Sequence, residues 1–178
     1  QFSEKLDFEK YPRSHDKDIL KLKLLKTDFI FIPNKDFIKS SMFSIQVGNL
    51  DKILCGLDRK NHFSGVATVV LKFLILLNPK YLYLGEKDFQ QILVIRKLIK
   101  DFSINTKVKT FRTIRERKGL AFSSRNLKLS KAEKIIARNI FLELQKIKKI
   151  ISCKPMHISE LEKIKKTLIK LGFDHINY

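Results

Sequence analysis

Cysteine is scarce in this chain of 178 residues, which contains only Cys55 and Cys153. The two lie far apart in the sequence and form no C-x-x-C pair, the spacing typical of zinc and dithiol redox sites. Two reduced thiols in a cytosolic protein explain the pattern better than a metal or redox site.

Long uninterrupted apolar runs are also missing. The longest, from about Val66 to Leu77, is broken by Lys72 and is shorter than the roughly 20 residues that span a bilayer. No basic-then-apolar leader with a small-residue cleavage site is present. We therefore expect a cytoplasmic protein with no membrane partner.

Acidic residues are few, 18 against 37 Lys and Arg, which leaves a net charge of +19. Such a charge fits a nucleic-acid-binding module. However, the basic residues are spread along the whole chain, and only eight are Arg, the side chain that forks onto phosphates and guanines. For these two reasons we expect no nucleic-acid partner. The positive charge of the chain would equally attract a small anionic substrate.

Hydrophobic residues make up 44% of the chain, enough for a core in one domain or in one domain and a smaller second one. Near the start, residues 16–26 show helical spacing of apolar residues. Phe29–Ile32 is an apolar run stopped by Pro33 and predicts a strand buried on both faces. Residues 43–47 predict a weaker strand, and residues 50–54 about one helical turn.

The centre of the sequence predicts a βαβ unit. An apolar helix over residues 65–77 ends at Asn78-Pro79, and Tyr81–Leu84 predicts a short buried strand. Residues 88–102 predict a helix and 107–111 another strand. Strand, helix and strand with short connections are typical of a right-handed unit in a parallel sheet.

The character of the chain changes near Ile114. Residues 113–126 are polar and basic, and Ser130 to Glu133 forms a capping-box pattern that predicts a long helix to about Ile151. Residues 158–171 predict another amphipathic helix, closed by Gly172. We place a domain boundary near Ile114. No pair among the four histidines has metal-ligand spacing on one element, so we expect no protein metal site.

Three stretches could carry chemistry. Gly85-Glu86-Lys87-Asp88 follows a predicted strand and opens a helix, where backbone N–H groups and the helix dipole favour anions. The alternative is a capping box from Asp88 to Gln91 with no ligand.

Ser123-Ser124-Arg125-Asn126 offers two hydroxyls and a guanidinium suited to a transferred phosphate. The alternative for this stretch is a solvated turn. Arg59 and His62 precede the apolar helix and could bind a carboxylate or phosphate, although a lone loop histidine is more often structural.

Taken together, these stretches resemble pantothenate synthetase. The resemblance lies in residues 62–70 (HFSGVATVV), 85–91 (GEKDFQQ) and 119–126 (GLAFSSRN), and more weakly in Gln1-Phe2 and Tyr11-Pro12-Arg13. It implies an α/β fold with two parts. Residues 1–113 would form a Rossmann-like, parallel-sheet domain that binds nucleotide and pantoate and lacks its first part. Residues 114–178 would form a smaller, largely helical α+β lid domain that lacks its end.

The resemblance also implies an activity. Pantoate would attack the α-phosphate of ATP with Mg²⁺ as cofactor, giving pantoyl adenylate, and β-alanine would then displace AMP. The protein would be a homodimer. Lys87 and Arg125 would be the catalytic residues present, and the ATP-binding set would be Gly85, Glu86, Lys87, Asp88, Ile114, Phe122, Ser123, Ser124 and Arg125. Gln1 and Gln91 would hold pantoate, Gln1 would also lie near β-alanine, and Arg59 and His62 would line a basic wall.

The sequence departs from the family pattern in several places. A His-x-Gly-His motif belongs upstream of Gln1, so we expect a fragment whose activity alone is doubtful. Cys55 stands where a Glu is common, and Lys17 and Lys118 replace commonly acidic residues. Lys17 weakens the implied presence of an acidic Mg²⁺ partner near Asp18. Mg²⁺ would then be held by ATP oxygens and water. Another nucleotidyltransferase of similar architecture, with a different acceptor, is the main alternative function.

Overall fold

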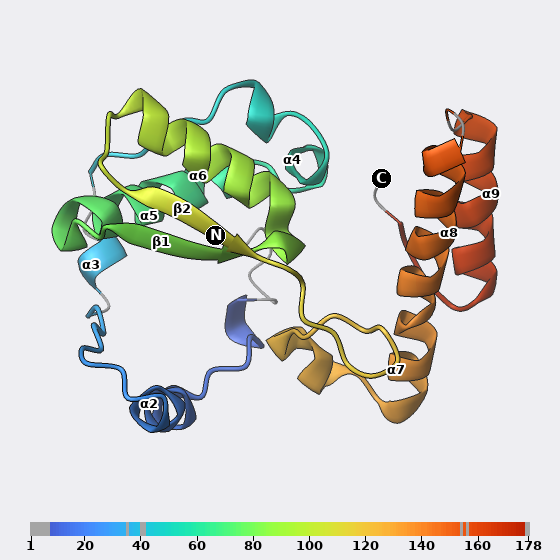
Figure 1. Ribbon diagram of the computed structural model, residues 1–178, viewed down its shortest axis with the longest axis horizontal. Helices are drawn as coiled ribbons and strands as arrows, with labels where there is room; N and C mark the ends of the chain where they lie inside the picture. Colours follow the sequence, from blue (N-terminus) through green and yellow to red (C-terminus); the bar gives the residue numbers. More distant parts are fainter. Residues whose placement is uncertain (1–7, 35, 40–41, 154, 156, 177–178) are drawn as a thin grey trace. The chain divides into compact units, whose positions relative to one another are not determined.

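The computed structural model describes residues 8–34, 36–39, 42–153, 155 and 157–176 (Figure 1). The chain forms two compact units. The first contains Gln1–Leu82 and Gln90–Lys109, and the second contains Tyr83–Phe89 and Thr110–Tyr178. The expected division into domains 1–113 and 114–178 stays a prediction.

The predicted βαβ unit is confirmed. Strands β1 (Tyr81–Gly85) and β2 (Lys107–Phe111) form a two-stranded parallel sheet, joined by helix α6 (Phe89–Asp101) (Figure 1). At the start of the sheet, the amide of Lys107 donates to the carbonyl of Lys80 at 3.0 Å. The fold is the mixed α/β, Rossmann-like class expected from the sequence.

The core lies between α6 and helix α5 (His62–Leu77). Its buried side chains come from both helices, and Leu82 of β1 packs against them. The buried cluster contains Phe63, Ala67, Leu74, Val94 and Leu98. Strand β1 is less buried than predicted, because its side chains alternate between faces and Tyr83 is 60% exposed.

The predicted helix near the start is present as α2 (His15–Leu24), without a buried side chain. The prediction of a buried strand over Phe29–Ile32 is wrong, since the run is irregular and Phe29 is 92% exposed. A strand needs a hydrogen-bonded neighbour, and the described sheet pairs only β1 with β2. Phe31 instead contacts the rings of Phe37 and Phe73 edge-on, at 6.0 and 6.2 Å between centroids.

The weak strand predicted over residues 43–47 is also wrong. This segment has no regular secondary structure, and two of its amides donate to hydroxyls of α5 rather than to a neighbouring strand. Ile45 N donates to Thr68 Oγ1 at 2.8 Å, and Val47 N donates to Ser64 Oγ at 3.0 Å. The short elements nearby are α3 (Asp36–Lys39), the 3₁₀ turn η1 (Asn49–Asp51), which accounts for part of the turn predicted over 50–54, and α4 (Cys55–Asp58).

The second unit is mostly helical beyond residue 123, with η3 (Ser124–Lys128), α7 (Lys131–Ala137), α8 (Asn139–Cys153) and α9 (Ile158–Lys170). The predicted capping box opens α7. The amide of Ser130 donates to Glu133 Oε2 at 2.7 Å, and the amide of Glu133 donates to Ser130 Oγ at 3.2 Å. The single long helix predicted after it is divided at Arg138, where a tighter turn joins Phe141 N to the Arg138 carbonyl.

Gly172 follows α9 with φ of +103°, which confirms the predicted glycine stop. Within the described ranges, no helix is both long and apolar enough to cross a membrane.

Candidate functional site

The Gly85–Asp88 turn lies at the carboxyl end of β1. Residues Glu86–Asp88 form the 3₁₀ turn η2, and α6 begins directly after it at Phe89. Gly85 has an ordinary extended conformation, with φ of −85°, and a Cβ added there would meet no atom within 4 Å. Folding of the described chain therefore does not require this glycine, and the open space beside it allows a ligand to approach the backbone.

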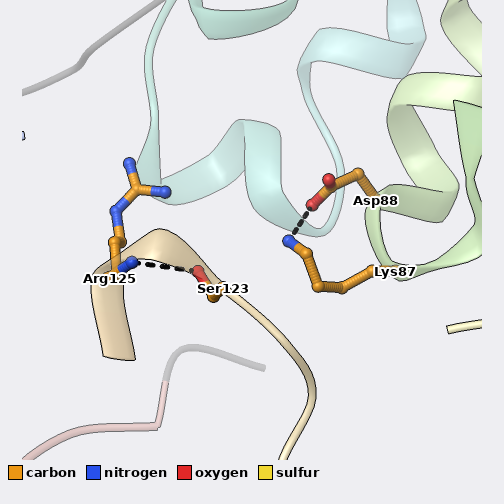
Figure 2. A network of polar contacts seen from close by, with 4 residues as sticks. All are labelled: Lys87, Asp88, Ser123 and Arg125. Carbon is orange, nitrogen blue, oxygen red and sulfur yellow. Dashed lines mark hydrogen bonds and ion pairs between the residues drawn. The ribbon is translucent and has the colours of Figure 1, made fainter. Parts of the chain in front are cut away.

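Lys87 pairs with its neighbour Asp88, with 2.8 Å between Nζ and Oδ1 (Figure 2). Both side chains are exposed, so the pair contributes little to stability and its ammonium can exchange partners. In the described turn no side chain caps η2, and the Asp88 carboxylate binds Lys87 rather than opening α6. The Asp88-to-Gln91 capping box is thus not the explanation for this motif.

Two adjacent glutamines at the start of α6 have different environments. Gln91, the predicted pantoate residue, is half-buried, whereas Gln90 is buried and only 6% exposed. Gln90 Nε2 donates to the carbonyls of Leu50 and Ile53 at 2.7 and 2.8 Å, and its Oε1 accepts from Cys55 N at 3.0 Å. Gln90 thereby holds the 50–55 segment against α6. The two adjacent glutamines have the same chemistry, so local sequence gave no signal that Gln90 rather than Gln91 would be buried.

The Ser123–Asn126 segment forms the start of η3. The hydroxyl of Ser123 accepts the amide of Arg125 at 3.3 Å (Figure 2), and Asn126 Nδ2 donates to the Ala121 carbonyl at 2.8 Å. Ser123 therefore bonds the backbone of its own turn, as the alternative describes, and its role in ATP binding stays a prediction. Ser124 and Arg125 are exposed, so these local bonds fix the turn and present both side chains to solvent.

A β-hairpin precedes this turn, and the polar and basic composition of residues 113–126 did not predict it. Arg115 and Ala121 form an antiparallel bridge, with Phe122 N donating to the Ile114 carbonyl at 3.0 Å. Ile114 and Phe122, both predicted to contact ATP, are 72% and 59% exposed. They lie opposite each other in the hairpin, so their side chains share one face.

The remaining predicted residues lie in or next to α4, α5 and α6, or outside the described residues. Arg59 is exposed at the end of α4, and His62 is the first residue of α5, with its ring 5.0 Å from that of Phe63. Asp51 holds the start of α5 by accepting from Phe63 N and Ser64 Oγ, at 3.3 and 2.9 Å. Arg59, His62 and Gln91 belong to the first compact unit. The second unit holds Gly85 to Asp88, Ile114 and Phe122 to Arg125, and Gln1 lies outside the described residues.

Metal-ligating side chains do not gather in the described ranges: no group of three His, Cys, Asp or Glu residues there could hold an ion. At the Lys87 turn, Glu86 accepts from Thr110 Oγ1 at 3.4 Å and Asp88 binds Lys87.

Comparison with known proteins gives consistent results. The family model for pantoate-beta-alanine ligase matches residues 1–178. The pantothenate synthetase of Thermodesulfovibrio yellowstonii is 37% identical over 154 residues, covering 85% of this chain and 55% of that protein.

Solved structures of the same family are also similar to this chain. A pantoate-beta-alanine ligase from Francisella tularensis, complexed with beta-gamma ATP and beta-alanine, has a TM-score of 0.84 and 36% identity over 96% of this chain and 63% of that one. Pantothenate synthetase from Thermus thermophilus has a TM-score of 0.87 and 31% identity, over 97% and 63%.

This chain thus spans less than two thirds of the length of these relatives. Since the family model matches the whole sequence and solved members share both its fold and about a third of its residues, the chain belongs to the pantoate-beta-alanine ligase family.

Proposed function

We propose that this chain serves the ATP-dependent condensation of pantoate with β-alanine. The pantoate carboxylate oxygen attacks the α-phosphorus of ATP, the bond to the bridging oxygen breaks, and pyrophosphate leaves. The β-alanine amine then attacks the acyl carbon of pantoyl adenylate, loses a proton, and releases AMP. Family membership and the geometry of the Lys87 turn support this reaction.

The observation that carries the proposal is the exposed ammonium of Lys87 beside an unobstructed Gly85 at a strand's carboxyl end. Ligands bind at this edge in open parallel sheets. A triphosphate would replace Asp88 as the partner of Lys87, because an exposed pair costs little to break. Reactions at phosphorus depend mainly on positioning and charge stabilisation, which an ammonium and the Arg125 guanidinium can supply.

The other predicted residues take supporting roles in this proposal. Gly85 to Asp88 would receive the phosphates, while Ile114 and Phe122 would contact the adenine through their exposed apolar side chains. Ser123, Ser124 and Arg125 would grip the phosphates. Gln91 would bind pantoate together with Gln1, which would also lie near β-alanine, and Arg59 and His62 would form the basic wall.

Three further features belong to the same proposal. Mg²⁺ would enter on ATP and be held by phosphate oxygens and water, where it would neutralise phosphate charge. The chain would act in the cytoplasm. It would also form a homodimer, which the large exposed apolar side chains of the first unit favour, among them Phe29, Phe31 and Ile32.

The direct test is Lys87→Ala. Mg-ATP affinity, measured by calorimetry, should fall about tenfold or more, and AMP formation from pantoate, β-alanine and ATP should fall by at least about a hundredfold. The matched control is Lys100→Ala, which removes an exposed lysine near the other end of α6.

The comparison requires that the unaltered chain binds Mg-ATP and forms AMP. Equal ATP affinity and equal AMP formation in Lys87→Ala and such an unaltered chain would rule out this role for Lys87. Pyrophosphate release with acceptors other than pantoate, at comparable rates, would favour a different nucleotidyltransferase.

A further inference from the structure

The hairpin over residues 114–122 makes few bonds of its own. Its backbone is joined by Phe122 N to the Ile114 carbonyl, Glu116 N to the Leu120 carbonyl at 2.8 Å, and Gly119 N to the Glu116 carbonyl at 2.8 Å. An isolated two-stranded hairpin is marginally stable in water. A fixed position for this one therefore requires support from another element.

That support comes from Phe141 on α8. The guanidinium of Arg115 lies over the Phe141 ring, 4.3 Å from its centroid, and Arg115 Nη1 donates to the Gly119 carbonyl at 3.1 Å. A cation over an aromatic face is attracted by the ring quadrupole. The Arg115 side chain thus hydrogen-bonds the tip of the hairpin and stacks on the Phe141 ring of α8.

Gly119 completes the contact from the hairpin side. It is buried, its φ is +93°, and a Cβ at this position would lie 2.3 Å from Phe141 Cδ1. The absence of a side chain lets the backbone touch the ring, and the positive φ would strain any other residue. Arg115, Gly119 and Phe141 therefore form one packed contact, which we call the Arg115 clamp.

The clamp determines which face of the hairpin is turned outward. Adjacent residues of an extended strand point to opposite faces, so Arg115 and Ala121 share one face, while Ile114 and Phe122 share the other. Since Arg115 faces α8, Ile114 and Phe122 point away from that contact, in keeping with their high exposure. Phe122 is followed directly by Ser123, so the turn that carries Arg125 starts from the same fixed strand.

We propose that Arg115 and Phe141 are positioning residues, which hold the hairpin so that Ile114, Phe122 and the Ser123–Arg125 turn are preformed for an adenine nucleotide. The proposal rests on the ATP-dependent function proposed above. Neither residue would touch the nucleotide. Loss of the clamp would weaken ATP binding by adding the cost of ordering the hairpin and would leave pantoate binding unchanged.

The test uses two disruptive variants, Phe141→Leu and Arg115→Gln, with two controls. Phe141→Tyr keeps an aromatic face for the guanidinium. Arg117→Gln removes the same charge from an exposed position of the same loop. Hydrogen exchange of the Glu116 and Phe122 amides reports on the hairpin without any ligand, and calorimetry gives the affinities for Mg-ATP and pantoate.

In both disruptive variants we expect exchange of these amides to accelerate about tenfold, and Mg-ATP affinity to fall about tenfold with pantoate affinity unchanged. Phe141→Tyr and Arg117→Gln should behave as the unaltered chain. If the clamp had a purely structural role, its loss would instead weaken the binding of both Mg-ATP and pantoate.

Unchanged exchange in Phe141→Leu and Arg115→Gln would overturn the clamp. Accelerated exchange with unchanged Mg-ATP affinity would overturn its positioning role. An unaltered chain that binds pantoate but not Mg-ATP would contradict the proposed function and the nucleotide part of this inference, while the exchange rates would still decide whether the clamp holds the hairpin.

Discussion

Gln90 and Gln91 are identical in chemistry and adjacent in sequence, yet only one of them is tied into the fold by a set of hydrogen bonds. Gln90 is buried and bonded to three backbone groups of the 50–55 segment. Gln91 is half-buried at the next position of the helix. A helix rotates successive residues by about 100°, so Gln90 and Gln91 point in different directions and meet different surroundings.

We predict that Gln90→Leu destabilises the chain. The change keeps an apolar body of similar size but leaves the Leu50 carbonyl and the Cys55 amide without their Gln90 partner, which costs about 2 kcal/mol or more. Urea unfolding followed by circular dichroism measures the loss. Gln91→Leu is the matched control and should change the unfolding free energy by less than about 0.5 kcal/mol. An equal loss of unfolding free energy in Gln90→Leu and Gln91→Leu would contradict the structural role assigned to Gln90.

At the scale of elements, helices were predicted more reliably than strands. The Ser130–Glu133 box starts α7 as expected, because its partners are three residues apart and need no other part of the chain. Phe29–Ile32 has the composition of a buried strand but not its structure, because strand formation depends on a neighbour that local sequence does not specify.

The capping box also predicts a pH dependence. Hydrogen bonds from the Ser130 hydroxyl and then from its backbone amide lower the pKa of Glu133 below its ordinary value of 4.5. A lowered folded-state pKa means that the carboxylate stabilises the folded state above the unfolded pKa, and that this contribution is lost as pH falls through the folded pKa.

Glu133→Ala should therefore lower the melting temperature by a few degrees near neutral pH, and the difference should shrink below about pH 4.5. Thermal unfolding at several pH values tests this. Glu162→Ala, which removes an exposed carboxylate that caps no helix in the described structure, is the control. A difference for Glu133→Ala that stays constant down to about pH 3 would show that the carboxylate charge is irrelevant.

At the scale of the whole molecule, charge and apolar exposure act against each other. Each chain carries +19, so two copies repel, whereas the exposed apolar side chains favour association. Added salt screens the repulsion and leaves apolar burial in place.

We predict that the dimer fraction, measured by light scattering, rises between about 50 and 500 mM salt. Binding to nucleic acid would show the opposite dependence, because counterion release weakens it steeply as salt increases. A duplex titration over the same salt range is the matched experiment. A monomer at every salt concentration would contradict the proposed homodimer.

The sequence by itself determined the central βαβ unit, the start of α7, the stop of α9 and the family. These follow from local periodicity, turn chemistry and motifs of a few consecutive residues, all of which act over short separations. Tertiary structure decided the role of Gln90, the irregular course of residues 29–32 and 43–47, and the contact of Arg115 and Gly119 with Phe141. Each of these joins segments far apart in the chain, or depends on a pairing partner, and no pattern within one segment specifies which distant groups will meet it.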